Sequence, residues 1–240
     1  MCRIYSRMDE MKVLPPSEVY ERELLYMPWG TLIREVSDIL ERDVPKNGHL
    51  LDLMCGTGHL VGNVSTKRSD LVLEGVDINP EFIRYARGIY KKVSFEEADV
   101  LQWQPRQQYD AITCTAGIHH LSYGNQEHFI GRIADALKPS GFCILADPYI
   151  DDYFNESERK IAAARLGCEY LAASVRNGAP DDTIKACIDI LYNDVLGFEF
   201  KTSVKKMVSI LEKNFDSVIK HKVWPAIDSE YGDYYFVCSV

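Results

Sequence analysis

The sequence predicts an α/β fold, a doubly wound, seven-stranded, mostly parallel sheet with a helical cap. Short apolar runs alternate with segments of helical periodicity, which is typical of βαβ units. A glycine-rich turn follows the first apolar run, and an acidic residue ends the second. The chain has 240 residues, the length of one such domain, so we expect a single domain over residues 1–240.

Seven segments have the length and apolar composition of strands. They are residues 49–54, 71–77, 93–95, 109–115, 141–147, 217–224 and 234–240. The connection between the last two, residues 225–233, is too short for a helical crossover. We therefore expect the last strand to run antiparallel to the others.

Helix signals lie between and around these runs. Asn79 before Pro80, and later Ser203, are residues of the type that caps a helix. Residues 1–45 form an N-terminal helical segment, in which apolar side chains recur at helical spacing. Residues 150–200 form a long helical insertion after the fifth strand, and we expect it to cover a binding site.

Composition and charge disfavour several classes of partner. The net charge is −9, whereas binding to nucleic acid requires clustered positive charge. No apolar run approaches the roughly 20 residues of a membrane span, and the N-terminus lacks the apolar core of a signal peptide. The seven cysteines form no CxxC pair, which favours a reduced, metal-free protein. We therefore expect a cytoplasmic monomer or homodimer.

The glycine-rich turn, residues 50–60, has the sequence LLDLMCGTGHL. Gly56 and Gly58 let the backbone approach a ligand closely, and the following helix N-terminus favours negative charge. Asp77 ends the second strand, 19 residues after Gly58. At that position a carboxylate can accept hydrogen bonds from both ribose hydroxyls of an adenosine. The two signals together predict an adenosine-containing cofactor.

From about residue 46 onward the chain resembles the class I S-adenosylmethionine-dependent methyltransferases, whose fold is Rossmann-like. Five segments carry the resemblance, in the family's order: Asp52 with Gly56 and Gly58, then Asp77, then Ala98-Asp99-Val100, then the fourth strand with its His-His-Leu segment, and then Ala-Leu-Lys-Pro-Ser-Gly-Phe at residues 136–142. One position departs from the pattern, because Met54 stands where the family has the first glycine of the turn.

The resemblance implies S-adenosylmethionine as the cofactor, held at the carboxyl ends of the strands. It further implies that Asp77 binds the ribose, that Asp99 contacts the adenine amino group, and that the last strand is inserted near the sheet edge. The expected cofactor-binding residues are Asp52, Cys55, Gly56, Gly58, Asp77, Ile78, Asp99, Val100, Thr115, Ala116 and Tyr26.

His119 and His120 are candidates for a catalytic base, because imidazole titrates near neutrality. The His-His-Leu segment recurs in the family across many substrates, so helix-end packing is the alternative for at least one of them. Methyl transfer needs a dedicated base only when the nucleophile must lose a proton. The sequence therefore leaves the catalytic residue open.

Two further groups of residues have alternative interpretations. Asp147, Asp151 and Asp152 follow the fifth strand and are of the type that ligates Mg²⁺, but we interpret them as a solvated acidic loop. Tyr20, Tyr26 and Trp29 are either core aromatics or a cover over the methionine end of the cofactor. We also predict that residues 1–30 and 150–200 form a mobile lid.

The predicted function is methyl transfer to an oxygen, nitrogen or carbon nucleophile of a small molecule, whose identity the sequence does not specify. One alternative is a nicotinamide-dependent oxidoreductase. The turn weakens that alternative because it lacks the third glycine of G-x-G-x-x-G. The other alternative is a non-catalytic, methyltransferase-like module that binds the cofactor or a protein partner.

Overall fold

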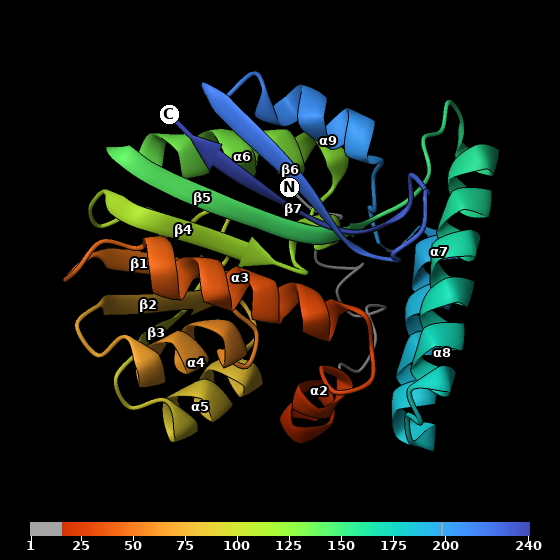
Figure 1. Cartoon of the computed structure of the whole chain (residues 1–240), viewed down its shortest axis with the longest axis horizontal. Helices are drawn as coiled ribbons and strands as arrows, with labels where there is room; N and C mark the ends of the chain where they lie inside the picture. Colours follow the sequence, from red (N-terminus) through yellow and green to blue (C-terminus); the bar gives the residue numbers. More distant parts are fainter. Residues whose placement is uncertain (1–15, 198) are drawn as a thin grey trace, which may run out of the picture.

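The computed structural model describes residues 16–197 and 199–240. Its centre is a seven-stranded sheet in the order β3-β2-β1-β4-β5-β7-β6 (Figure 1). The strands are β1 (His49–Leu53), β2 (Val72–Asp77), β3 (Ser94–Glu97), β4 (Tyr109–Thr115), β5 (Leu137–Tyr149), β6 (Ser217–Trp224) and β7 (Gly232–Ser239). The chain builds outward from β1 to β3 and then returns to the other side of β1. This order confirms the predicted doubly wound sheet.

The strand directions follow the prediction as well. The five strands β1 to β5 pair in parallel, whereas β7 runs antiparallel to both β5 and β6. The last strand is therefore antiparallel and inserted one position from the edge. Several strand boundaries differ from the prediction by one or two residues, and β5 differs most, because it begins at Leu137 and not at Gly141. Leu137 pairs with Tyr109 ahead of an irregularity in β4, which extends the strand backwards.

Eight α-helices surround the sheet in the described part of the chain, with one short 3₁₀ helix. They are α2 (Ser17–Glu23), α3 (Trp29–Asp43), α4 (His59–Lys67), α5 (Pro80–Ile89), η1 (Ile118–His120), α6 (Tyr123–Ala136), α7 (Glu156–Arg176), α8 (Asp181–Leu196) and α9 (Val204–Leu211). The Asn79 side chain accepts hydrogen bonds from two backbone N–H groups of α5, and the Ser203 side chain accepts one from Lys206 N–H of α9. Among the helices of residues 16–197 and 199–240, none is long and apolar enough to cross a membrane.

Helices lie on both faces of the sheet (Figure 1), and each face packs against its helices through an apolar layer. Helices α3, α4 and α5 cover one face, where Val36, Val61 and Ile83 are fully or almost fully buried. Helices α6 and α9 cover the other face through Phe129 and Met207. With both faces covered, the carboxyl edge of the parallel strands is left for a ligand site.

Helices α2, α7 and α8 lie beyond that carboxyl edge (Figure 1). The α7–α8 hairpin is the predicted helical insertion, and α7 packs through Ala163 and Leu166 against Ile150 at the end of β5. An ion pair between Arg22 and Asp182, with 2.5 Å between the charged atoms, connects α2 to α8. Residues 1–15 of the predicted N-terminal segment lie outside the described residues.

Candidate functional site

The glycine-rich turn between β1 and α4 has a left-handed backbone at three positions. The φ angles are +56° at Met54, +53° at Gly56 and +77° at Gly58. This conformation costs a residue with a side chain about 1–2 kcal/mol, whereas glycine adopts it without that cost. Met54 therefore keeps the glycine-like backbone of the turn and is strained in it. Gly117 leaves room for its side chain, because a Cβ there would lie 2.9 Å from Met54 Cβ.

Asp77, at the end of β2, ties its strand to the glycine-rich turn. Its Oδ2 accepts a hydrogen bond from Gly56 N–H at 2.8 Å, and its Oδ1 accepts one from Asn79 N–H, also at 2.8 Å. The residue is 9% exposed, and burial raises the pKa of its carboxyl despite these hydrogen bonds. Asp77 is therefore part of the wall of the turn.

Asp52, on β1, is a buried acid with one unsatisfied oxygen. Its Oδ1 accepts a hydrogen bond from Thr113 Oγ1 at 2.8 Å. Its Oδ2 is buried and has no hydrogen-bond partner among the residues that the structure describes. Burial raises the pKa of this carboxyl to about 7. A buried acceptor without a partner costs about 1–3 kcal/mol, more when it is charged, so this position suits a ligand that donates a hydrogen bond.

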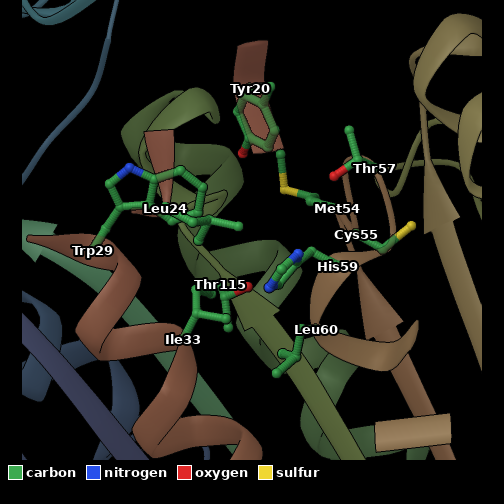
Figure 2. A pocket seen from close by; sticks show the side chains of 10 residues that line it. All are labelled: Tyr20, Leu24, Trp29, Ile33, Met54, Cys55, Thr57, His59, Leu60 and Thr115. Carbon is green, nitrogen blue, oxygen red and sulfur yellow. The ribbon is translucent and has the colours of Figure 1, made fainter. Parts of the chain in front are cut away.

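A pocket lies against the turn, and the N-terminal helices form its other side (Figure 2). The Tyr20 ring packs between Trp29 and Phe82, with ring centroids 5.5 and 5.1 Å away. A Cβ on Gly56 would lie 3.6 Å from this ring. The aromatic cover therefore rests directly on the glycine of the turn. The lining residues are Tyr20, Leu24, Trp29, Ile33, Met54, Cys55, Thr57, His59, Leu60 and Thr115.

Glu21 fastens α2 to the start of α4. Its carboxylate accepts a hydrogen bond from the Thr57 hydroxyl and lies 2.5 Å from His59 Nδ1. The other ring nitrogen of His59 is 2.8 Å from the Asn63 side-chain amide. These contacts could not be predicted from the sequence, because Glu21 and His59 are 38 positions apart and match no motif.

The structure brings some of the predicted cofactor residues together and separates others. Cys55 and Thr115 line the pocket, as do Tyr20 and Trp29 of the three candidate aromatic residues. Tyr26 does not line it; its backbone carbonyl instead accepts a hydrogen bond from Asn177. Ala116 follows Thr115 with a φ of +49°.

The remaining predicted residues lie after β2 and β3. Ile78 is 49% exposed beside Asp77, whereas Val100 is 5% exposed and packs in the core. The Asp99 carboxylate accepts hydrogen bonds from Leu101 N–H and from the Gln102 side chain. In this structure, therefore, Asp99 stabilises a local turn, and its contact with adenine stays a prediction.

A second polar cluster follows β4 and contains both candidate histidines. His119 Nδ1 lies 2.7 Å from Asp147 Oδ1, and His119 N–H donates to the other oxygen of that carboxylate at 3.1 Å. His120 Nδ1 lies 2.7 Å from Glu199 Oε2. Burial is the largest influence on both imidazoles and lowers the pKa of His119 well below its usual range. For His120, burial also acts to lower the pKa, but the charge of Glu199, its hydrogen bond and the charge of Asp147 together raise it.

The expectation of a solvated loop at Asp147, Asp151 and Asp152 is wrong for the first of these residues. Asp147 is 2% exposed and burial raises the pKa of its carboxyl to about 7. It lies inside β5, which extends beyond the predicted end of that strand. Asp151 forms an ion pair with Arg165, and Asp152 forms one with Lys206. The three acids therefore do not converge on one site.

Glu23, on α2, gives the protein a pH-dependent stability. It is 3% exposed, and burial, with a contribution from Asp182, raises the pKa of its carboxyl from 4.5 to about 8. A carboxyl whose pKa is raised binds more protons when folded, so stability falls as pH rises from about 4.5 to about 8. We expect Glu23→Gln to be more stable than the parent at pH 9 by on the order of 1–3 kcal/mol, and nearly equal at pH 4.

Urea unfolding at a series of pH values measures this difference. Glu18→Gln, at an exposed position of the same helix, is the matched control and should leave the pH profile unchanged. If Glu23→Gln kept the pH dependence of the parent, this assignment to Glu23 would be wrong.

Comparison with known proteins shows that part of this chain is similar to methyltransferases. Residues 50–141 match the family model described as a methyltransferase domain. The carboxy-S-adenosyl-L-methionine synthase of Campylobacter curvus is 31% identical over 119 residues, which are 48% of this chain and 50% of that protein. The trans-aconitate 2-methyltransferase of Escherichia coli O1:K1 is 33% identical over 100 residues, 42% of this chain and 39% of that protein. The chain thus spans about half, or less, of these curated relatives.

Similarity to solved structures extends over the whole fold. Magnesium protoporphyrin IX methyltransferase from Synechocystis PCC 6803, solved with bound S-adenosylhomocysteine, superposes with a TM-score of 0.60. The similarity covers 98% of this chain and 94% of that protein at 13% sequence identity. At 13% identity this similarity supports the fold alone. The evidence for the site comes from the glycine-rich turn and the acids beside it.

Proposed function

We propose that this chain is a class I S-adenosylmethionine-dependent methyltransferase, and that it transfers the methyl group of that cofactor to an oxygen, nitrogen or carbon atom of a small molecule. The observation that carries the proposal is the bond between the Asp77 carboxylate and Gly56 N–H at 2.8 Å. It places the acid of β2 against the glycine of the turn, where an adenosine ribose would meet both.

The residues around the turn fit the cofactor chemically. Gly56 offers a backbone that a ligand can approach, and Asp77 offers acceptors for the ribose hydroxyls. The unpartnered Oδ2 of Asp52 is suited to a donor such as the ammonium group of the methionine moiety. When bound, S-adenosylmethionine supplies an electrophilic methyl group on its sulfonium. The nicotinamide alternative is disfavoured, because the family match is to methyltransferases.

The protein's own contribution is to orient the acceptor and to exclude water. Holding two reacting groups in position can supply roughly 7–11 kcal/mol of the barrier reduction. Tyr20, Trp29 and Leu24 cover the turn with apolar surface. The acceptor is expected between this cover and the α7–α8 hairpin, beside His119 and His120. Such a covered site suits a small molecule.

The proposal is tested by incubating the full chain with S-adenosylmethionine and a panel of small hydroxyl, carboxyl, amine and activated-carbon compounds. Formation of S-adenosylhomocysteine and of a methylated product, both detected by mass spectrometry, is the expected result. Calorimetric titration with S-adenosylmethionine and with NAD is the companion measurement. Binding of the former without product from any acceptor would favour the non-catalytic module, and binding of NAD alone would favour the oxidoreductase.

We propose further that α2 and the α7–α8 hairpin act as one lid. In this structure the Tyr20 ring lies against Gly56, so the ring and the helix that carries it must shift when a cofactor occupies the turn. Arg22 and Asp182 join α2 to α8, so such a shift reaches the hairpin. We expect added S-adenosylhomocysteine to slow amide hydrogen exchange in α2, α7 and α8 more than in α6, the internal reference. Equal exchange with and without the ligand would show ordinary packing instead.

A further inference from the structure

His119, His120 and Glu199 direct three metal-binding groups toward one point. One ligand atom from each lies within 4.8 Å of the other two. His120 Nδ1 is 2.7 Å, and His119 Nε2 is 3.8 Å, from the same oxygen, Glu199 Oε2. Ligand atoms around a tetrahedral metal ion at about 2.0–2.2 Å are roughly 3.3 Å apart, which lies between these two distances.

The groups behind His119 hold it in the tautomer that a metal ligand needs. Asp147 Oδ1 lies 2.7 Å from Nδ1, so the proton is placed on Nδ1 and the lone pair on Nε2. The backbone fixes the ring further, because Phe200 N–H donates to the His119 carbonyl at 2.7 Å. A carboxylate behind a histidine in this way is the usual second layer of a metal site. With this tautomer, the Nε2 lone pair faces a carboxylate oxygen, an arrangement that a cation stabilises.

Charge around the cluster also favours a cation. Asp147, Glu199 and Asp194 are three acids in this region, and Lys201 is the amine that faces them. Lys201 Nζ is already paired with Asp194 at 2.6 Å, and both side chains are almost fully buried. The side chains of Asp147 and Glu199 are 3% and 12% exposed. Neither forms an ion pair with a lysine in the described part of the chain, although the charge of Lys201 also acts on both carboxylates. Three carboxylates with one amine leave a net negative charge in this region, which a bound divalent ion would offset.

We propose that His119, His120 and Glu199 bind one divalent transition-metal ion, and that this ion holds an oxygen atom of the methyl acceptor. The second part rests on the proposed function. Two imidazoles with one carboxylate favour zinc, iron, cobalt or manganese over magnesium, which prefers oxygen ligands. Three protein ligands leave coordination positions open, and the His120 side chain, 38% exposed, opens the site to solvent. An acceptor hydroxyl bound there loses its proton to water more readily.

Metal binding is measured on the full chain, first with Co²⁺ by visible absorption and then with Zn²⁺ and Mn²⁺ by calorimetry. The parent is expected to bind one equivalent. Glu199→Gln and His120→Asn are expected to weaken binding by at least about 100-fold, and Asp147→Asn by about 10–100-fold. His128→Asn, at an exposed position of α6, is the matched control and should bind as the parent does.

Thermal unfolding of each variant shows whether it is folded, and Glu199→Gln keeps the shape of the native side chain. No binding by the parent, or equal binding by the parent and folded Glu199→Gln, would overturn the metal site. The cluster would then consist of two hydrogen-bonded pairs, His119 with Asp147 and His120 with Glu199.

The role of the ion is tested separately, with an oxygen acceptor that the parent methylates. Chelation should abolish methyl transfer, reloading the metal should restore it, and binding of S-adenosylhomocysteine should not change. An unchanged rate after the ion has been removed would overturn the role in holding the acceptor, with the metal site intact. Metal binding without product from any acceptor would instead contradict the proposed function.

Discussion

Replacing Asp77 with alanine is expected to weaken S-adenosylmethionine binding by roughly 10²–10⁴-fold. Two charge-assisted hydrogen bonds to the ribose would be lost, at about 1.5–3 kcal/mol each. The change also releases Gly56 N–H and Asn79 N–H, both of which donate to this carboxylate. The substitution therefore removes both the contact with the ribose and the hydrogen bonds that hold the turn in place. Isothermal titration of the folded variant measures the effect.

Glu97→Ala is the matched control for this substitution. Glu97 pairs with Asp77 in the register of β2 and β3 and is exposed, so its removal deletes the same charge at the same sheet edge. We expect it to bind the cofactor like the parent. If Asp77→Ala also bound like the parent, the location of the cofactor site would be wrong.

Lys201→Met is expected to destabilise the fold by about 3–5 kcal/mol, because it leaves a buried acid without its partner. Lys201 and Asp194 are 4% and 1% exposed at their side chains, and their charged atoms lie 2.6 Å apart. Asp194 Oδ2 already lacks a hydrogen-bond partner among the described residues, so the carboxylate has no other support there. Urea unfolding at pH 7 measures the loss.

Two companion variants define the cause of that loss. Lys213→Met removes an exposed ion pair with Glu127, whose side chains are 58% and 51% exposed; it should cost less than about 1 kcal/mol. The double variant Lys201→Met with Asp194→Leu should recover much of the loss, because the Asp194 carboxylate is no longer left buried without its partner. A double variant no more stable than the single one would assign the loss to packing.

Most of the fold could be predicted from the sequence, because its signals are local. The run at Tyr109–Thr115 and the cap at Asn79 appear in the structure where the sequence places them. The glycine-rich turn was also recognisable, since Gly56 and Gly58 lie within three residues of each other. Even Met54, the departure from the family pattern, adopts the backbone that the motif requires.

The parts of the site that the sequence did not reveal depend on distant pairs. Glu199 meets His120 from 79 positions away, and Tyr20 reaches Gly56 from a helix that belongs to no motif. Asp147 looked like the first acid of a loop because two more acids follow within five residues. It is buried because β5 extends beyond its apolar run and pairs with β7 as far as Tyr149. Pairing between strands that are far apart in the chain cannot be predicted from the local sequence pattern.

The place of β7 between β5 and β6 sets the order in which the sheet can assemble. Among the described residues, β6 joins the rest of the sheet only through β7, and Cys238 of β7 pairs with Cys143 of β5, 95 positions earlier. Closing a flexible loop of that length costs about 4 kcal/mol of chain entropy before any pairing repays it. The strands β1 to β4, joined by shorter crossovers, can pair first, and we expect docking of the β6–β7 hairpin on β5 to be a late step of folding. Until it occurs, β5 presents an unpaired edge, the kind of edge through which partly folded chains associate.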